Sequence, residues 1–216
     1  MKKTKAENDT INLYKNTGWK SLFAKIRFWD SPYREIEKLI PDRGMITELG
    51  CGEGVFSNYL GVSSIKRNIV GIEIDKNRVE DADRGFKNVS FIKANALEVR
   101  IPESDCIVMF HLLHHLNSFK DQELLLKTSK EALKKNGILV LVEIAEKPLI
   151  KYLITWFTDY FIVPWLFEKK FVAKKIYFRR VNEWKNLLSS NGFSVKTRLV
   201  NKGMPFSHAI FVAEIK

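Results

Sequence analysis

Cysteine and proline are scarce in this chain of 216 residues, which has two and six of them respectively. Cys51 and Cys106 are too few for a disulfide framework, and no spacing of histidine and cysteine matches a zinc motif. Three of the four histidines lie close together, at His111, His114 and His115, yet no third ligand stands at a convincing spacing from them. We therefore expect a reducing, intracellular setting and no bound metal.

Long apolar runs are also missing. The basic start, MKKTKAENDT, leads into no signal-peptide core, and the most apolar stretch, 149–167, is interrupted by Lys151, Asp159 and Pro164. A membrane-spanning helix needs roughly 20 mostly apolar residues. We expect neither export nor a transmembrane helix, but a cytoplasmic protein. Peripheral contact with the inner face of the membrane is compatible with this expectation.

What the chain does contain is apolar residues, at 45%, and a formal net charge of +11. Such an apolar content excludes a disordered protein. The basic excess is uneven, because residues 44–147 carry 14 Lys and Arg against 15 Asp and Glu. Residues 148–181 carry seven against two, together with 10 of the 26 aromatic residues. The positive charge therefore belongs to the flanks and to this aromatic-rich segment.

From residue 44 onward, short apolar runs alternate with amphipathic ones, a pattern typical of a parallel sheet covered by helices. The predicted strands cover residues 45–49, 69–74, 89–93, 106–110 and 138–142, and the predicted helices cover 55–60, 77–84 and 121–134, the last one stopped by Asn136 and Gly137.

The end of the chain follows a different pattern, with a helix over 182–190 and then two strands, 193–199 and 209–215, joined by a short turn. Such a pair must be antiparallel. We thus expect an α/β fold with a mainly parallel sheet and an antiparallel C-terminal hairpin. Residues 1–43 are predicted to form a helical cap over the carboxyl edge of the sheet, residues 44–216 one domain, and 148–181 an insertion that acts as a lid.

The segment ELGCGEG follows the first predicted strand and opens a helix. Its glycines, Gly50, Gly52 and Gly54, allow a tight turn and close approach of a ligand, and the free amides of a helix start favour a polar or anionic group. The third glycine comes one residue too early for the dinucleotide fingerprint G-x-G-x-x-G. We therefore expect a nucleoside ligand other than NAD.

Further polar residues stand where other predicted strands end. Glu73, in the segment GIEID, can accept hydrogen bonds from both hydroxyls of a ribose, and Asn95 can bond an adenine edge or serve as an ordinary turn residue. His111 and Glu143 follow the fourth and fifth strands. Since open α/β sheets bind ligands at the carboxyl ends of their strands, this convergence predicts a binding site there.

These pieces together resemble the class I S-adenosylmethionine-dependent methyltransferases, in the small-molecule branch. The matching segments are ELGCGEG, GIEID, FIKANALE, SDCIVMFHLLHHL, GILVLVEI and VNEWKNLLSSNGF. The resemblance implies a seven-stranded sheet with a reversed last strand, S-adenosylmethionine as cofactor and S-adenosylhomocysteine as product. The cofactor-binding residues it implies are Glu48, Gly50, Cys51, Gly52, Gly54, Glu73, Ile74, Asn95 and Ala96. We expect His111 beside them, at a position where many relatives carry other polar residues.

The chemistry expected from the resemblance is in-line transfer of a methyl group, for which the protein mainly aligns the acceptor. A general base helps where the acceptor is protonated, and His111 and His114 are the candidates because imidazole titrates near neutrality. The alternative is that both histidines only line the pocket.

The acceptor must be inferred from residues 148–181. Tyr152, Trp156 and Tyr160 have helical spacing and are the predicted substrate contacts. Beyond them stand three basic pairs, Lys169-Lys170, Lys174-Lys175 and Arg179-Arg180. One interpretation is that the segment is a lid over an apolar small molecule, such as a lipid or quinone, and that the basic end of the lid contacts anionic lipids. The alternatives are packing against the sheet, an RNA methyltransferase whose basic flanks bind the phosphates, and a cofactor-binding partner protein without catalysis.

Overall fold

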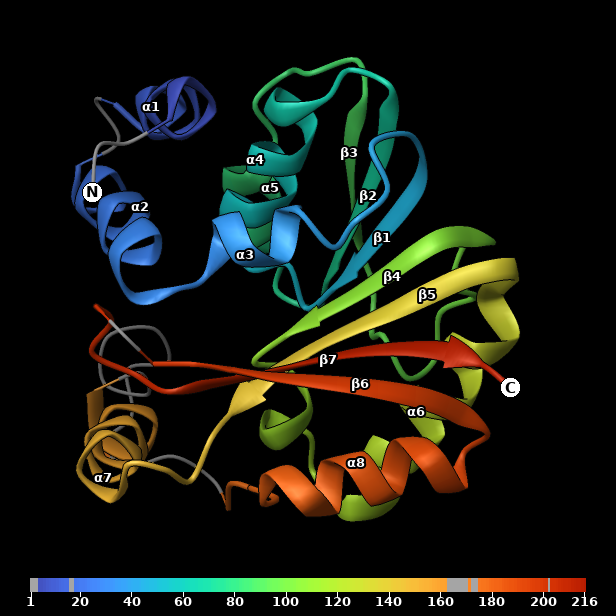
Figure 1. Cartoon of the computed structure of the whole chain (residues 1–216). Coiled ribbons are helices and arrows are strands. Elements are labelled where there is room, and N and C mark those ends of the chain that lie inside the picture. Colours follow the sequence, from blue (N-terminus) through green and yellow to red (C-terminus); the bar gives the residue numbers. More distant parts are fainter. Residues whose placement is uncertain (1–3, 16–17, 163–170, 172–174, 202) are drawn as a thin grey trace.

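The computed structural model describes residues 4–15, 18–162, 171, 175–201 and 203–216, and its centre is one twisted sheet (Figure 1). The sheet has seven strands in the order β3-β2-β1-β4-β5-β7-β6. Its strands are β1 (Gly44–Leu49), β2 (Arg67–Glu73), β3 (Val89–Lys93), β4 (Ser104–Phe110), β5 (Leu133–Ile144), β6 (Phe193–Val200) and β7 (His208–Ile215).

Strands β1 to β5 pair in parallel, whereas β7 runs antiparallel to both β5 and β6. The predicted fold class, a mainly parallel Rossmann-like sheet with a reversed C-terminal hairpin, is confirmed. Because β7 is inserted between β5 and β6, the last strand of the chain is an interior strand of the sheet.

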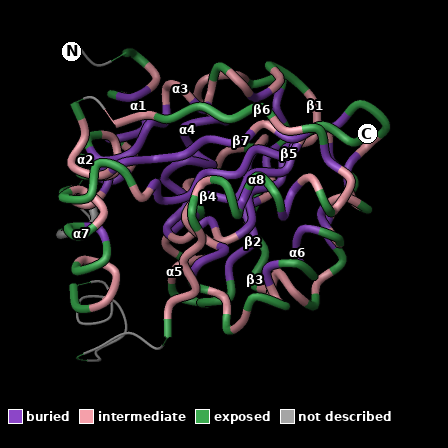
Figure 2. The backbone as a smooth tube through the Cα atoms, turned by 60° about the horizontal axis from the view of Figure 1, so that its bottom comes forward, coloured by how far each residue is buried: buried purple, intermediate pink, exposed green. Residues whose placement is uncertain are grey.

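Helices cover both faces of the sheet, so most residues of its central strands are buried (Figure 2). One face packs against α6 and α8 through side chains such as Leu125 and Trp184, and the other packs against α3 and α4 through Ile36 and Phe56. The helices are α1 (Lys5–Leu13), α2 (Trp19–Asp30), α3 (Tyr33–Glu37), α4 (Val55–Ser63), α5 (Lys76–Ala82), α6 (Phe119–Ala132), α7 (Leu149–Phe157) and α8 (Val181–Ser190), with the short turns η1 (Leu113–His115) and η2 (Thr158–Ile162).

The N-terminal segment is helical, and it contacts both α4 and the carboxyl edge of the sheet. The Tyr14 hydroxyl donates to the Glu53 carbonyl at 2.7 Å, which joins the end of α1 to the start of α4. At the end of α2, the Asp30 carbonyl accepts a hydrogen bond from His208 at 2.8 Å. The segment therefore reaches the edge where the polar residues of the sequence converge.

Helix α6 ends earlier than its sequence predicts. Ser118 caps its start by accepting from the Asp121 amide at 3.1 Å, but the helix stops at Ala132 and strand β5 begins at Leu133. Asn136 and Gly137, the predicted stop, lie inside β5 beside an irregularity in its pairing with β4. A Cβ on Gly137 would lie 3.0 Å from the Ser104 carbonyl oxygen, so this glycine serves a close strand approach instead of a helix end.

Within the described residues, no helix combines the length and the apolarity needed to cross a membrane. Of the predicted lid, 148–162, Phe171 and 175–181 are described. Of the basic residues expected to contact anionic lipids, Lys169, Lys170 and Lys174 lie outside the described residues, whereas Lys175, Arg179 and Arg180 are described.

Candidate active site at the carboxyl edge of the sheet

A cavity of about 400 Å³ lies where β1, β2, β3 and β4 end. This is the edge at which the sequence predicts a binding site, and the volume falls in the usual range for small-molecule sites. Its lining consists of Gly50, Ile72, Glu73, Ile74, Arg78, Ala94, Asn95, Ala96, Leu97, His111, Leu112, His115, Leu116, Asn117, Asp159, Lys175 and Ile176.

The glycine turn borders the cavity through Gly50, whereas Gly52 and Gly54 do not line it. Gly50 and Gly54 have φ values of 72° and 69°, in the left-handed region that favours glycine. The amides of Gly50 and Cys51 both donate to the Ile72 carbonyl, at 2.8 and 3.1 Å, so the turn is fixed to β2. A Cβ on Gly50 would lie 2.6 Å from the Leu112 side chain, and the missing side chain therefore keeps this wall open.

Glu48 and Cys51 lie beneath the turn and do not line the cavity. The Glu48 carboxyl accepts a hydrogen bond from the Ser57 hydroxyl, which connects β1 to the first turns of α4. Burial raises the pKa of Glu48 to about 7, although the Ser57 hydrogen bond and the charge of Arg27 oppose the rise. Its place in the structure is that of a buried support for the turn.

Glu73 lines the cavity from the end of β2, and backbone amides hold its carboxylate. One oxygen accepts from the Gly52 amide at 3.0 Å, and the other accepts from the amides of Ile74 and Asp75 at 2.9 and 3.0 Å. A carboxylate oxygen can accept more than one hydrogen bond, so Glu73 is oriented yet retains capacity for a ligand hydroxyl.

Ile74, Asn95 and Ala96 also line the cavity. The Asn95 side chain, however, is engaged in its own turn: its oxygen accepts from the Leu97 amide at 3.1 Å and its nitrogen donates to Glu98 at 2.8 Å. The structure thus gives Asn95 the ordinary turn role, while its position on the cavity wall agrees with the predicted site.

His111 reaches the cavity from the end of β4 in an unusual backbone conformation. Its φ of 52° is rare for a residue with a side chain and is common at functional sites. Its amide donates to the Val142 carbonyl at 2.9 Å, and its ring stacks on His208 with 5.0 Å between centroids. Contacts to β5 and to β7 therefore fix the position of this histidine.

The hydrogen bonds of this histidine pair define its tautomers. His208 Nε2 must donate to the Asp30 carbonyl, which can only accept. Burial lowers the pKa of His208 to about 4, so its Nδ1 carries no proton and accepts from His111 Nε2 at 3.0 Å. Burial, followed by the neighbouring His208, also holds the pKa of His111 well below its usual range. The remaining nitrogen of His111, Nδ1, is consequently an unprotonated acceptor.

His114 lies behind the cavity wall and is 1% exposed. Its Nδ1 lies 2.5 Å from Glu143, whose other oxygen accepts from the Leu113 amide at 3.0 Å. Burial alone would lower the pKa of His114, but the charge and hydrogen bond of Glu143 and the charge of Asp159 outweigh it, and the pKa is raised. His111 and His114 are thus neighbours with different environments.

The three predicted substrate contacts do not line the cavity in this structure. Tyr152 packs on Phe178 at 5.9 Å between ring centroids, and Trp156 stacks on Tyr160 at 5.0 Å. From the same segment, Asp159 on η2 reaches the cavity instead, and burial raises its pKa to about 6.

The far end of the predicted lid is attached to the domain by hydrogen bonds. The Gln122 side chain donates to the carbonyls of Leu113 and Tyr177 at 3.1 and 2.8 Å and accepts from Arg179 at 2.7 Å. In addition, the Tyr177 amide donates to the His114 carbonyl at 2.9 Å. Lys175 and Ile176, which precede this anchor, therefore form part of the cavity wall.

Sequence reasoning missed several residues of the site. The main ones are Arg78, His115, Asn117, Asp159, Lys175 and His208. His115 and Asn117 stand close to a motif already singled out, so proximity to His111 was a usable signal. For Asp159 and His208 the sequence contains no such signal, since the fold alone brings them to the end of β4.

The chain is similar in sequence to a curated methyltransferase. The chain is 27% identical over 134 residues to (S)-coclaurine N-methyltransferase of Thalictrum flavum subsp. glaucum, a match that covers 56% of this chain and 36% of that protein. The chain thus matches about a third of the length of this curated relative.

Solved structures share the fold. Human N-acetylserotonin methyltransferase in complex with S-adenosylmethionine superposes with a TM-score of 0.68 at 17% identity, over 97% of this chain and 56% of that one. Magnesium protoporphyrin IX methyltransferase from Synechocystis PCC 6803, with bound S-adenosylhomocysteine, gives 0.66 at 15% identity, over 97% of this chain and 100% of that one.

A family profile described as a methyltransferase domain matches residues 19–197, most of the chain. This match confirms the resemblance carried by the glycine turn and the segments that follow it. The chain belongs to the methyltransferase domain family.

Proposed function

We propose that this protein transfers a methyl group from S-adenosylmethionine to a small-molecule acceptor. The observation that carries the proposal is the cavity at the carboxyl edge, which joins the glycine turn and Glu73 to His111 and Asp159 in one space. The relatives named above are small-molecule methyltransferases by their own descriptions, which supports the same class of acceptor here.

The residues present fit a nucleoside cofactor. Gly50 leaves room that a Cβ would fill, Glu73 presents an oriented carboxylate at the end of β2, and Ala94 and Ala96 contribute apolar lining. In this assignment Glu73 accepts hydrogen bonds from the ribose hydroxyls, and Asn95 and Ala96 contact the adenine. Glu48 acts indirectly, because it supports the turn from below.

When bound, S-adenosylmethionine supplies an electrophilic methyl group. The protein then needs to align the acceptor, exclude water and receive a proton where the acceptor carries one. Between the two candidate bases, the geometry favours His111, which lines the cavity with an unprotonated Nδ1, over His114, which does not line it. In this arrangement His111 Nδ1 accepts a hydrogen bond from the acceptor, and its lowered pKa makes it a weak proton acceptor.

An apolar acceptor is supported by the surface of the predicted lid. Helix α7 and turn η2 expose many large apolar side chains, which is unusual for a surface in contact with water only. They are Leu149, Ile150, Leu153, Ile154, Trp156, Phe157, Phe161 and Ile162. Helix α2, at the same end of the molecule in Figures 1 and 2, adds Leu22, Ile26 and Trp29. We infer peripheral contact of this end with an anionic membrane, from which an apolar acceptor would enter.

Calorimetry tests the cofactor assignment. Titration with S-adenosylmethionine and S-adenosylhomocysteine should give one site per chain, and Glu73→Ala should weaken binding about 10- to 100-fold because charge-assisted hydrogen bonds are lost. Glu80→Ala, which removes an exposed glutamate from α5, is the matched control and should bind like the parent. Absence of binding, or equal binding by Glu73→Ala, would refute the assignment.

Transfer of a radiolabelled methyl group tests the acceptor class. Label should appear in the lipid-soluble fraction of a cell extract, and His111→Asn should reduce the rate while cofactor affinity holds, since asparagine tolerates a positive φ. Label in RNA would overturn the small-molecule assignment. Cofactor binding with no transfer to any fraction would favour a non-catalytic partner protein.

A further inference from the structure

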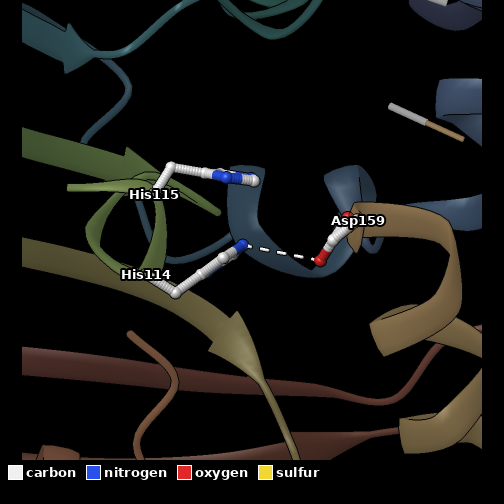
Figure 3. A group of neighbouring side chains, drawn as sticks. All are labelled: His114, His115 and Asp159. Carbon is white, nitrogen blue, oxygen red and sulfur yellow. Dashed lines mark ion pairs between the residues drawn. The ribbon is translucent and has the colours of Figure 1, made fainter. Parts of the chain in front are cut away.

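Three side chains from two distant segments meet beside the cavity. Figure 3 shows His114 and His115, adjacent on η1, with their rings directed toward Asp159 on η2. One ligand atom of each lies within 4.8 Å of the other two. The sequence predicts no metal site because the histidines have no third ligand nearby in the chain. The fold supplies that ligand from the segment after β5.

The nitrogen of His114 that faces this cluster has no hydrogen-bond partner. His114 Nε2 is fully buried, and its nearest carboxylate oxygen, on Asp159, lies 3.6 Å away, beyond hydrogen-bond distance. A buried polar atom without a partner costs free energy, so its presence calls for a ligand. Within the described residues only two other buried side-chain atoms share this condition, on Asn58 and Arg84.

The other side of the His114 ring is prepared in the way that metal-bound histidines usually are. A carboxylate accepts only, so His114 Nδ1 donates its proton to Glu143, and Nε2 then presents a lone pair when the ring is neutral. A carboxylate behind a histidine fixes its tautomer and makes it a better ligand. Phe178 stacks on the ring at 4.9 Å and holds its plane.

The separation of the ligand atoms suits an ion of small radius. Ligands about 2.0–2.1 Å from a tetrahedral ion lie roughly 3.4 Å from one another, close to the 3.6 Å between His114 and Asp159. His115 is exposed, and the structure describes no hydrogen bond or ion pair for its ring, so a small rotation brings its nitrogen inward. Two imidazoles and one carboxylate are ligands typical of zinc and its neighbours in the first transition row.

We propose that His114, His115 and Asp159 bind a divalent transition-metal ion of the zinc type. Two carboxylates contribute negative charge, Asp159 at the site and Glu143 behind His114. Arg78 and Lys175, which also line the cavity, contribute positive charge that partly balances it. Since His115 and Asp159 line the cavity, the remaining coordination position faces it. There the ion can hold the oxygen or nitrogen of the methyl acceptor. This role rests on the proposed function, whereas the binding of the ion is independent of it.

The test measures the ion directly. Protein stripped with a chelator is titrated with Zn²⁺ by calorimetry, and Co²⁺ serves as a spectroscopic probe, since its visible absorption reports coordination by nitrogen and oxygen. We expect one ion per chain with a dissociation constant on the order of 1 μM or lower. No binding at molar equivalence would overturn the proposal.

Variants locate the site. His115→Ala and Asp159→Asn should each weaken Zn²⁺ binding at least about 100-fold, and Glu143→Gln about 10- to 100-fold through the loss of orientation. Asp121→Asn, on α6 and away from the cavity lining, is the control for a lost carboxylate. Equal affinity in the parent, His115→Ala and Asp159→Asn would overturn the assignment. His115→Ala removes an exposed side chain, which keeps the test independent of folding.

Cofactor binding measured in the presence of chelator separates this proposal from the previous one. If S-adenosylmethionine binds and Zn²⁺ does not, the metal site is wrong and the proposed function stands. If Zn²⁺ binds at these residues and S-adenosylmethionine does not, the metal site stands and the proposed function fails.

Discussion

The two sides of the cavity are built in different ways. The side assigned to the cofactor consists of the glycine turn, Glu73 and residues 94–96, which are positioned by backbone hydrogen bonds at the ends of neighbouring parallel strands. The acceptor side consists of His111, His115, Asp159 and Lys175, which come from the end of β4, η1, η2 and the segment before α8.

This difference separates what is local from what is long-range. The cofactor side depends on glycines and on one carboxylate that directly follow their strands, so its geometry depends little on distant parts of the chain. The acceptor side depends on contacts such as His111 with His208 and His114 with Asp159, which join segments far apart in the sequence. The position of the first is therefore set mainly by the ends of the strands, and that of the second by tertiary packing.

The largest expected effect is a loss of cofactor binding on substitution of Gly50, which lies on the cofactor side alone. Gly50→Ala should weaken cofactor binding at least about 100-fold, because its Cβ would lie 2.6 Å from Leu112 at a φ of 72°. Gly85→Ala is the matched control, with a φ of 73° and no atom within 4 Å of the added Cβ. It should cost about 1–2 kcal/mol of stability and leave binding intact. Calorimetry and thermal melts distinguish them; equal cofactor affinity in the two variants would contradict this reading.

A second prediction concerns the support of the glycine turn. The pKa of Glu48 is about 7 in the folded chain and near 4.5 when unfolded, so between these values the folded state holds a proton that the unfolded state has released. The free energy of unfolding should therefore fall as pH rises from about 4.5 to 7, by on the order of 3 kcal/mol at most relative to Glu48→Gln. Urea denaturation at several pH values measures this. Parallel curves for parent and variant would exclude it, and exposed Glu80→Gln should track the parent.

The third prediction concerns the acceptor side alone. His208→Phe keeps a ring of similar size but removes the acceptor for His111 Nε2, so the tautomer of His111 is no longer fixed. We expect kcat to fall about 10- to 100-fold while the dissociation constant of the cofactor stays within about twofold. His208→Gln, which retains a donor and an acceptor, should recover part of the rate. A change in cofactor affinity as large as that in kcat would mean that the two sides are not separable.

The smallest expected effect tests the membrane surface. Leu153→Ser with Ile154→Ser removes two exposed side chains of α7, 53% and 47% exposed, and should reduce binding to anionic phospholipid vesicles roughly fivefold or more. Ile65→Ser with Leu124→Ser changes two exposed side chains elsewhere and serves as the control. Flotation measures the bound fraction. Failure of the parent to float, or equal loss in both double variants, would exclude this surface.

The local side of the site is also the side that the sequence predicts. Hydrophobic runs located β1 to β5, and because parallel strands end at one edge, Gly50, Glu73 and Asn95 could be expected together. The error at the end of α6 has a local cause too: Gly137 has the residue type of a helix stop, but it serves a close approach to Ser104. Residue type alone does not distinguish these two uses of glycine.

The acceptor side could not be predicted because its members share no pattern. Asp159 stands in an apolar helical stretch, where a single carboxylate is expected to face solvent. It becomes a site residue only because η2 lies against η1. The predicted contacts Tyr152, Trp156 and Tyr160 had the helical spacing of a lining surface, yet the structure turns Asp159 toward the cavity. Which face of a helix meets a site depends on packing that spacing does not specify.

The interior position of β7 determines when this site can form. Residues 208–215 are the last part of the sheet to leave the ribosome, yet β5 and β6 are joined only through them. The pairings among β1 to β5 and the hydrogen bonds of the glycine turn do not involve these residues. The partner of His111 arrives with His208, the first residue of β7. A chain truncated before β7 would therefore lack the hydrogen bond that orients His111, while the residues of the cofactor side would all be present.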